Sequence, residues 1–445
     1  MRFSTFSRYL VRTCLLVAMV LGTLLAAGQP GAGAQGQSGL FSATAAPSAP
    51  SRPARSNALR SRFVRADLSQ IAGLDGQQPA ERLTLNLFDD VTYTAIRTDS
   101  AALGKGRFSW VGDLAGVPGG QVTIAVDDGV LAAGIQAGLD FYQVRPAGDQ
   151  TYTINLIDQD APAIGLEPLV PTIEGDLLPP AEPSQAPDGE TIDVMVIYTP
   201  KARTAAGGTT AMNALVDLAV ADSNTAYTNS NVAQRLRLVY KGEINYAESA
   251  TANALDNFSI DLNLLTDQAG PDDPGGVMDS AHTLRDTYHA DLVVLLADYS
   301  GGYCGLAWIM LNEGPGFESS GFSVVNWDCA VAPQNSFAHE LGHNMGLAHD
   351  RLNANGAVLP YAYGYAVPGS FRTIMAYSCS PSCPRVRHFS NPNVLYAGQP
   401  TGIATSASNS AYNALALDNT ANTVAGFRTA PIVVTDRVYI PRIRR

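Results

Sequence analysis

The sequence is short of charge, and its charge is mostly of one sign. Only 15% of its 445 residues are charged, and 40 acidic residues outnumber 28 basic ones. Binding to nucleic acids needs a basic face, so this class of function is excluded and no nucleic-acid partner is expected. The length and the 46% apolar content are enough for two or three globular domains.

Long apolar runs are also missing. No run reaches the ~20 residues that a membrane-spanning helix needs. The apolar run at 14–27 follows Arg2, Arg8 and Arg12 and is followed by small residues at 32–34, an order that is typical of a secretory signal peptide. We predict a signal peptide over residues 1–34 and a secreted protein without a membrane span. A membrane anchor is the alternative.

Cysteine is scarce as well. Of the five cysteines, Cys14 lies in the signal peptide, which leaves Cys304, Cys329, Cys379 and Cys383. An even number in an oxidising compartment predicts two disulfides, with three possible connectivities. We favour Cys304 with Cys329 and Cys379 with Cys383. The alternative for the second pair is a metal-binding C-x3-C.

Composition divides the rest of the chain into segments. Residues 35–62 have too few large apolar side chains for a core. Residues 63–158 alternate apolar and polar side chains, as at 83–87, and predict a small all-β domain. Residues 159–190 carry seven prolines and predict an acidic, exposed linker.

From residue 191 to 428, strand patterns alternate with helical ones. Apolar runs predict strands at 192–200, 236–240, 291–298 and 321–328. Helical spacing runs from Thr210 to about Tyr227, and a last helix ends near Phe427. This order favours an α/β (α+β) domain with a twisted mixed sheet and helices packed on it. Residues 429–445 are expected to be a tail.

Three of the six histidines stand within eleven positions, in AHELGHNMGLAHD at 338–350. We predict a helix that has Pro333 in its first turn and that includes residues 335–345. His339 and His343 then lie one turn apart on one face. Gly346 ends the helix in a left-handed conformation, and His349 returns as a third ligand.

Three neutral imidazoles leave one position open on zinc, which is typical of a catalytic site. We therefore predict one catalytic Zn²⁺, with Glu340 beside it as the general base and acid of a hydrolysis. Metal binding is expected to fail in acid, since a histidine ligates the metal only through a neutral imidazole. The alternatives are surface histidines on an ordinary helix and a structural metal site, although a structural site would more often use cysteines. The sequence makes no prediction about calcium.

The pattern HExxHxxGxxH resembles the long zinc signature of the metzincin metalloproteases, which also carry a methionine turn. TIMAY at 373–377 is similar to that turn and would place Met375 beneath the metal. Asp350, after the third histidine, is as in reprolysin-like members. Together with YAYGYA and FSNPNVLYAGQPTG, these motifs resemble the bacterial peptidyl-Asp metalloendopeptidases over residues 191–428. FSWVGDLAGVPGGQVTIAVDDGV is weakly similar to their propeptide.

The resemblance implies a metzincin-like catalytic domain with a small C-terminal subdomain, made as a zymogen and acting on proteins or peptides. It implies that substrates lie along an edge strand, for which we favour GLAWIM at 305–310. Tyr377 is shared with astacins and serralysins, which implies an oxyanion stabiliser; the alternative is packing. The reprolysin-like members from venoms lack that role.

Basic residues gather near the methionine turn. Residues 351–428 contain five arginines against one acid, Asp418; the arginines are Arg351, Arg372, Arg385, Arg387 and Arg428. Our hypothesis is that Arg385 or Arg387 selects Asp, or else Glu, on the primed side of the scissile bond. The alternative is that both are solvated surface arginines.

Residues 35–190 contain neither cysteine nor histidine, so a propeptide there cannot block zinc with a thiolate. It would cover the cleft, with a carboxylate or a backbone group, or act as a folding aid. The competing interpretation is a permanent binding module at 63–158. For the whole chain, we expect a monomeric secreted zinc endopeptidase; the alternatives are a zinc-stabilised adhesin without turnover and a zinc esterase or amidase.

Overall fold

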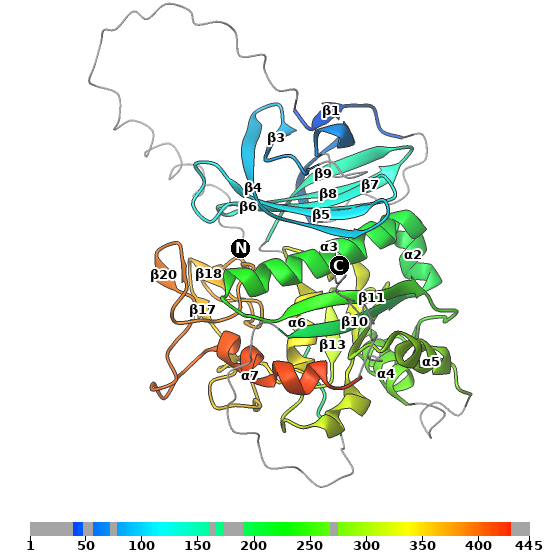
Figure 1. The fold of residues 1–445 in the computed structure, drawn as a ribbon, viewed down its shortest axis with the longest axis vertical. Coiled ribbons are helices and arrows are strands. Elements are labelled where there is room, and N and C mark those ends of the chain that lie inside the picture. Colours follow the sequence, from blue (N-terminus) through cyan, green and yellow to red (C-terminus); the bar gives the residue numbers. More distant parts are fainter. Residues whose placement is uncertain are drawn as a thin grey trace, which may run out of the picture. The chain divides into compact units, whose positions relative to one another are not determined.

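The computed structural model describes residues 39–47, 57–71, 78–159, 166–171, 190–267 and 275–428 (Figure 1). The predicted signal peptide and C-terminal tail lie outside the described residues, as does most of the proline-rich linker. Within the described part of the chain, no helix combines the length and the apolar character that a membrane crossing requires.

The N-terminal half of the described chain forms one antiparallel sheet in the order β1-β2-β9-β8-β7-β6-β5-β4-β3 (Figure 1). Its strands are β1 Phe41–Ala43, β2 Ala58–Ala66, β3 Arg82–Phe88, β4 Val91–Gly104, β5 Arg107–Leu114, β6 Gln121–Asp127, β7 Val130–Ala137, β8 Asp140–Gly148 and β9 Thr151–Ile157. In β3, Leu83, Leu85 and Leu87 are buried, as their alternation predicts. Asp128 and Gly129 join β6 to β7 with φ of +44° and +78°, as a two-residue hairpin turn requires.

This sheet begins earlier than the sequence predicts. Strand β1 and part of β2 belong to residues 35–62, for which no core was expected, yet Leu40 and Phe41 are buried. The Phe41 amide donates to Oδ1 of Asn86 at 2.9 Å, and Nδ2 of Asn86 donates to the Phe41 carbonyl. A strand of three residues is too short to show an alternation, so its position depends on these long-range hydrogen bonds.

The second half contains a five-stranded sheet in the order β11-β10-β12-β14-β13. Its strands are β10 Thr191–Tyr198, β11 Arg235–Glu243, β12 Leu292–Ala297, β13 Gly305–Ala307 and β14 Phe322–Asn326. Four strands are parallel, and β13 runs antiparallel to β14. The apolar runs of β10 and β12 are buried almost throughout, as parallel strands covered on both faces require. The predicted mixed sheet is confirmed.

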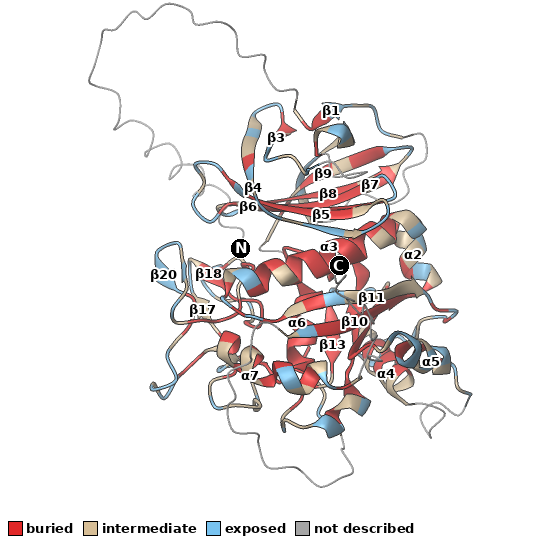
Figure 2. Cartoon of the chain, viewed as in Figure 1, coloured by how far each residue is buried: buried red, intermediate tan, exposed pale blue. Residues whose placement is uncertain are grey.

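Helices cover this sheet. They are α2 Pro200–Ala206, α3 Thr209–Asn229, α4 Ala254–Thr266, α5 Asp279–Tyr288, α6 Ser336–Asn344 and α7 Asn413–Ala425. Helix α3 is buried along most of its length (Figure 2) because it contacts β11 on one side and β5, β6 and β7 of the nine-stranded sheet on another. Ala125 and Ala132 of that sheet share one hydrophobic cluster with α3 and α6.

After α6 the regular elements are short. β15 Ala348–Asp350 pairs with β16 Tyr363–Gly364, β17 Ala366–Val367 with β18 Phe371–Arg372, and β19 Leu395–Tyr396 with β20 Gln399–Pro400. Helix α7 follows and contacts β10. Disulfides join Cys304 to Cys329 and Cys379 to Cys383, which is the connectivity favoured from the sequence. The first links the start of β13 to the turn that leads toward α6.

Candidate metal and active centre

Helix α6 carries the first two histidines on one face. His339 and His343 are separated by one helical turn, and both are buried. The helix begins at Ser336, after Asn335 in a left-handed conformation with φ of +51°. Pro333 therefore precedes the helix and is not in its first turn, which corrects the sequence prediction. A proline pattern alone could not distinguish these two positions.

Gly346 turns the chain back toward the helix. Its φ is +88°, and a Cβ atom there would come within 2.7 Å of Cβ of Val358. Only glycine combines this backbone conformation with so close a neighbour. The Leu347 amide then bonds the Gly342 carbonyl at 2.9 Å, and β15 carries His349 to the other two rings.

The three rings converge through their Nε2 atoms, which lie 3.1–3.2 Å from one another. Nδ1 of His339 lies 2.9 Å from the Ile374 carbonyl, and Nδ1 of His343 lies 2.8 Å from the Leu347 carbonyl. A carbonyl only accepts, so each of these Nδ1 atoms carries the proton and each Nε2 presents a lone pair. Burial lowers the pKa of His339 and His343 well below its usual value, which keeps both neutral.

Lone pairs that meet at this distance repel unless a cation lies between them. Ligands at 2.0–2.1 Å from one ion with tetrahedral angles stand about 3.3 Å apart, which fits the observed spacing. Within the described residues, His339, His343 and His349 form the group of ligating side chains close enough to hold a metal ion. This donor set fits zinc, and it leaves room for a further ligand.

Glu340 lies beside this centre and against the edge strand. Its side chain packs over Gly305 of β13, where a Cβ atom would come within 2.7 Å of Cγ and 2.8 Å of Cδ. Burial raises the pKa of Glu340 well above its usual value, and Arg385 opposes that shift. A carboxylate held in this way has a strong tendency to take up a proton.

Three residues that follow the histidines in the chain, Asp350, Met375 and Tyr377, contact the segments that form this centre. Sδ of Met375 packs against the helix at Gly342, where a Cβ atom would approach it to 2.7 Å. Asp350 accepts the Tyr377 amide at 3.0 Å and so ties the end of β15 to the segment after Met375. The Tyr377 ring lies against His349, with ring centroids 4.1 Å apart. Burial raises the pKa of Tyr377, with a further contribution from the acidic neighbours Glu167 and Glu340, so its hydroxyl keeps its proton.

The two candidate specificity arginines lie in different places. Arg385 donates to the carbonyls of Gln334 and Ala376, and it interacts electrostatically with Glu340 and Tyr377. Burial and the neighbouring Arg372 lower its pKa. Since a guanidinium stays charged in proteins, this shift indicates a buried cation that is poorly compensated.

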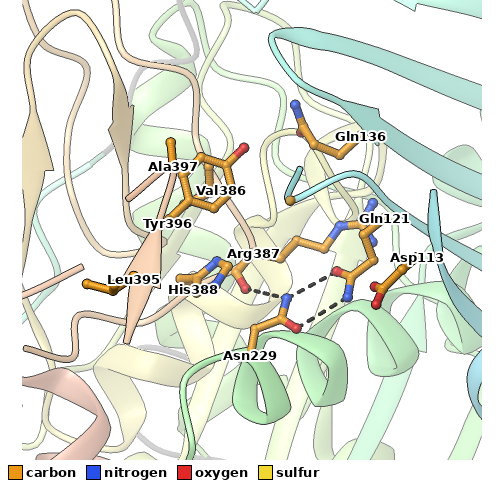
Figure 3. A pocket seen from close by; sticks show the side chains of 11 residues that line it. Asp113, Gln121, Gln136, Asn229, Val386, Arg387, His388, Leu395, Tyr396 and Ala397 are labelled. Carbon is orange, nitrogen blue, oxygen red and sulfur yellow. Dashed lines mark hydrogen bonds between the residues drawn. The ribbon is translucent and has the colours of Figure 1, made fainter. Parts of the chain in front are cut away.

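Arg387 instead contacts the nine-stranded sheet. Its Nη1 donates to Oγ1 of Thr123 at 2.7 Å, and its Nη2 donates to the Gly134 carbonyl at 3.1 Å. It also lines a cavity of about 200 Å³, in which Asn229 bonds the Arg387 carbonyl and Gln121 (Figure 3). None of the three histidines lines that cavity. The hypothesis that Arg387 selects the substrate stays a prediction, because in the uncut chain the Arg387 guanidinium is engaged by the nine-stranded sheet.

The structure adds one residue that the sequence did not suggest. Glu167 lies in the described part of the proline-rich linker, and its Oε1 is 3.4 Å from Nδ1 of His349 and 3.4 Å from the Tyr377 hydroxyl. A single glutamate among prolines has no periodic signal, and 182 residues separate it from His349. Only the folded chain brings them together.

Comparison with known proteins agrees with this geometry. Residues 189–407 match the family described as Metallo-peptidase family M12B Reprolysin-like. The chain is 36% identical over 361 residues to the peptidyl-Asp metalloendopeptidase of Stenotrophomonas maltophilia (strain K279a), covering 75% of this chain and 80% of that one. It is 35% identical over 451 residues to the protein of the same name from Xanthomonas campestris pv. campestris, covering 95% and 100%. The similarity therefore includes the region of the nine-stranded sheet.

Proposed function

The chain belongs to the reprolysin-like metallopeptidases of family M12B and is a metalloendopeptidase, and from this premise we propose that it is a secreted zinc enzyme with Glu340 as its general base and acid. The observation that carries the proposal is the meeting of three Nε2 lone pairs beside a buried carboxylate. A zinc-stabilised adhesin would need the histidines and would have no use for Glu340.

His339, His343 and His349 would hold the zinc ion. When bound, zinc supplies Lewis acidity, lowering the pKa of a water in its open position toward ~7 and polarising a carbonyl group. Glu340 accepts a proton from the attacking water at its carboxylate and then delivers it to the departing amine nitrogen. The Tyr377 hydroxyl, which stays protonated, donates a hydrogen bond to the oxyanion that develops on the substrate carbonyl.

The substrate would lie extended along β13 and residues 308–310, with main-chain hydrogen bonds that do not depend on its sequence. Arg385 would select the side chain on the primed side. An Asp carboxylate would compensate its buried charge, and a forked guanidinium matches a carboxylate in two hydrogen bonds. The names of the relatives, which are peptidyl-Asp metalloendopeptidases, support this preference.

Secretion and processing complete the proposal. Residues 1–34 would direct export and be removed, and the two disulfides suit an oxidising compartment. The β-domain at 63–158 would be a propeptide, released when the linker at 159–190 is cut. The mature enzyme would act on unfolded or extended protein segments as a monomer.

The decisive experiment replaces Glu340 with Gln in the full chain. We expect the metal content, measured by elemental analysis, to stay at one zinc per chain. Hydrolysis of an unstructured protein is expected to fall by about 10²- to 10⁴-fold, because the proton acceptor is lost. The exposed Glu81→Gln change in the β-domain is the matched control and should alter neither quantity.

Sequencing the new N-termini in the same digest tests specificity. Cleavage next to Asp is expected in the parent chain. Unchanged hydrolysis by the Glu340→Gln chain, or a folded parent without stoichiometric transition metal, would contradict the proposed function. A parent that binds zinc without producing any peptides would favour the adhesin, and cleavage restricted to small esters would favour the esterase.

A further inference from the structure

A short piece of the linker pairs with the edge of the catalytic sheet through one isolated β-bridge. The Leu169 amide donates to the Ala307 carbonyl at 2.9 Å, and the Ile309 amide donates to the Leu169 carbonyl at 2.8 Å. Leu169 thereby forms a parallel bridge with Trp308. This is the strand edge along which a peptide substrate would lie, so residues 166–171 occupy the place of a substrate.

The same piece is anchored by an apolar side chain. Leu166 is 9% exposed and belongs to the hydrophobic cluster that also contains Leu306 and Phe322. Leu169 and Trp308 pack against this cluster from outside. Val170, in contrast, is 62% exposed. The segment is therefore held by the Leu166 side chain and the Leu169 main chain, while Val170 lies in solvent, and its burial does not alternate as in a regular strand.

Glu167, which lies between Leu166 and Leu169, faces the histidine centre. His339 and His343 hold their Nδ1 protons on carbonyls of the catalytic domain, but the acceptor for His349 is Oε1 of Glu167, 3.4 Å away. The Tyr377 hydroxyl donates to the same oxygen at 3.4 Å. The uncut linker thus supplies the outer partner of the third ligand and engages the hydroxyl assigned to the oxyanion.

We propose that residues 166–171 are an intramolecular inhibitor, in which Glu167 is a latch that holds His349 and Tyr377 while the Leu169 backbone fills the substrate edge of β13. This inference rests on the proposed function of the site and names its regulation. A carboxylate from outside the catalytic domain fixes the third ligand, and the cleft stays closed to peptides until the segment leaves.

The chemistry of the segment explains why it is not itself a substrate. The group that reaches the centre is a side-chain carboxylate, which carries no scissile bond. The next residue, Pro168, has no amide hydrogen to donate to the strand edge. The segment is also tethered to the β-domain, so its local concentration at the cleft is on the order of millimolar even though its own contacts are few.

The position of the activating cut determines which part of the chain keeps the inhibitory segment. A cut between residues 172 and 189 leaves residues 166–171 attached to the β-domain, so inhibition ends only when that domain dissociates. A cut between 160 and 165 leaves the segment attached to the catalytic domain, although without its tether to the β-domain.

The first test measures hydrogen exchange in the full zinc-loaded chain with Glu340→Gln, a background in which self-cleavage is blocked. The Leu169 and Ile309 amides should be protected. Adding Glu167→Gln should speed exchange at both amides by about tenfold or more, because a hydrogen bond to a charged group is lost. Adding Glu81→Gln instead should leave both rates unchanged. Equal rates in the two double variants, or no protection in the parent, would overturn the proposal.

The second test measures hydrolysis of a quenched Asp-containing peptide by chains that keep Glu340 and remain uncut. Glu167→Gln should raise the rate of the uncut chain by about tenfold or more over the parent. Glu81→Gln, at an exposed position outside the segment, should leave it unchanged. A rate no higher than that of the parent, in a chain whose cut form is active, would count against the latch. If even cut chains hydrolyse nothing, the proposed function fails, while the exchange experiment still decides whether the segment occupies the edge.

Discussion

At the scale of single residues, hydrogen-bond acceptors determine what each histidine can do. The Ile374 and Leu347 carbonyls hold the Nδ1 protons of His339 and His343, which aims their Nε2 lone pairs at one point. Such outer partners fix the tautomer and orient a ligand for the metal. The histidine motif therefore needs the methionine turn, since Ile374 directly precedes Met375.

His388 illustrates the opposite case, a buried histidine without a charge-stabilising partner. Among the described residues, its Nδ1 has no hydrogen-bond partner, and burial, with Arg387 nearby, lowers the pKa of His388 to about 4. The unfolded chain takes up this proton below pH 6.5, whereas the folded chain does so only near pH 4. The stability that His388 contributes is therefore full above pH 6.5 and is lost as the pH falls to 4.

We predict that His388→Gln removes this part of the acid sensitivity. Between pH 7 and pH 4 the parent should lose about 3 kcal/mol more of its free energy of unfolding than the variant, at ~1.4 kcal/mol per pH unit. Urea denaturation at both pH values measures the difference, and effects of the other histidines cancel in the comparison. Parallel losses in both proteins would show that His388 is not the group responsible.

A second prediction at this scale concerns Arg385 and Arg387. Arg385→Ala should reduce the preference for Asp over Asn substrates, measured as a ratio of kcat/KM, by about 10- to 100-fold, because a charge-assisted hydrogen bond is lost. Arg387→Ala, the matched control, should keep the preference in the activated enzyme, since the Arg387 guanidinium pairs with Asp222 of α3 at 3.5 Å within the catalytic domain. The assignment fails if Arg385→Ala discriminates as well as the parent.

At the scale of elements, β13 and α6 are in close contact where Gly305 meets Glu340. The Glu340 side chain lies directly over Gly305, which explains why the edge strand begins with a residue that has no side chain. The disulfide from Cys304 holds the start of this strand in register with the turn before α6. The proposed substrate edge and the proposed general base are thus positioned by one local packing contact.

We expect Gly305→Ala to displace Glu340 and to lower kcat by about 100-fold, since a misplacement of about 1 Å costs that much. Gly314→Ala is the matched control, because a Cβ atom at Gly314 meets nothing within 4 Å. Thermal melts should show both variants folded. If the two variants have the same kcat, the contact between Gly305 and Glu340 has no catalytic importance.

At the scale of the whole molecule, a buried ion network joins the nine-stranded sheet to the catalytic domain. Arg107 of β5 bonds Asp217 of α3 at 2.6 and 3.0 Å, and Lys241 of β11 bonds Asp217 at 2.9 Å as well as Asp127 of β6. The carboxylates of Asp217 and Asp127 are almost fully buried. Removing one cation leaves a buried charge without its partner, which is strongly destabilising.

Arg107→Ala should therefore weaken the hold of the β-domain after the linker is cut. We expect its dissociation constant, measured by sedimentation of the cut chain, to rise by about 100-fold or more. Arg60→Ala is the control, because Arg60 pairs with the exposed Asp90 inside the same sheet. An equal affinity for both cut variants would mean that the network does not hold the two parts together.

The sequence alone determined the parts of this protein that depend on local order. Short apolar runs became strands of the mixed sheet, helical spacing became α3, and the four fixed spacings of the motif from His339 to His349 predicted the metal centre. In each case the residues that matter lie close together in the sequence, so their period or spacing carries the information.

The tertiary structure decided what depends on contacts between distant segments. It separated Arg385 from Arg387, which stand two positions apart in the chain yet face different partners. It formed the strand β1 within residues 35–62, for which no core was predicted, and it placed Glu167 next to His349, 182 residues away in the chain. Such contacts leave no periodic signal in a single sequence, because their energy comes from burial and hydrogen bonds that exist only once the chain has folded.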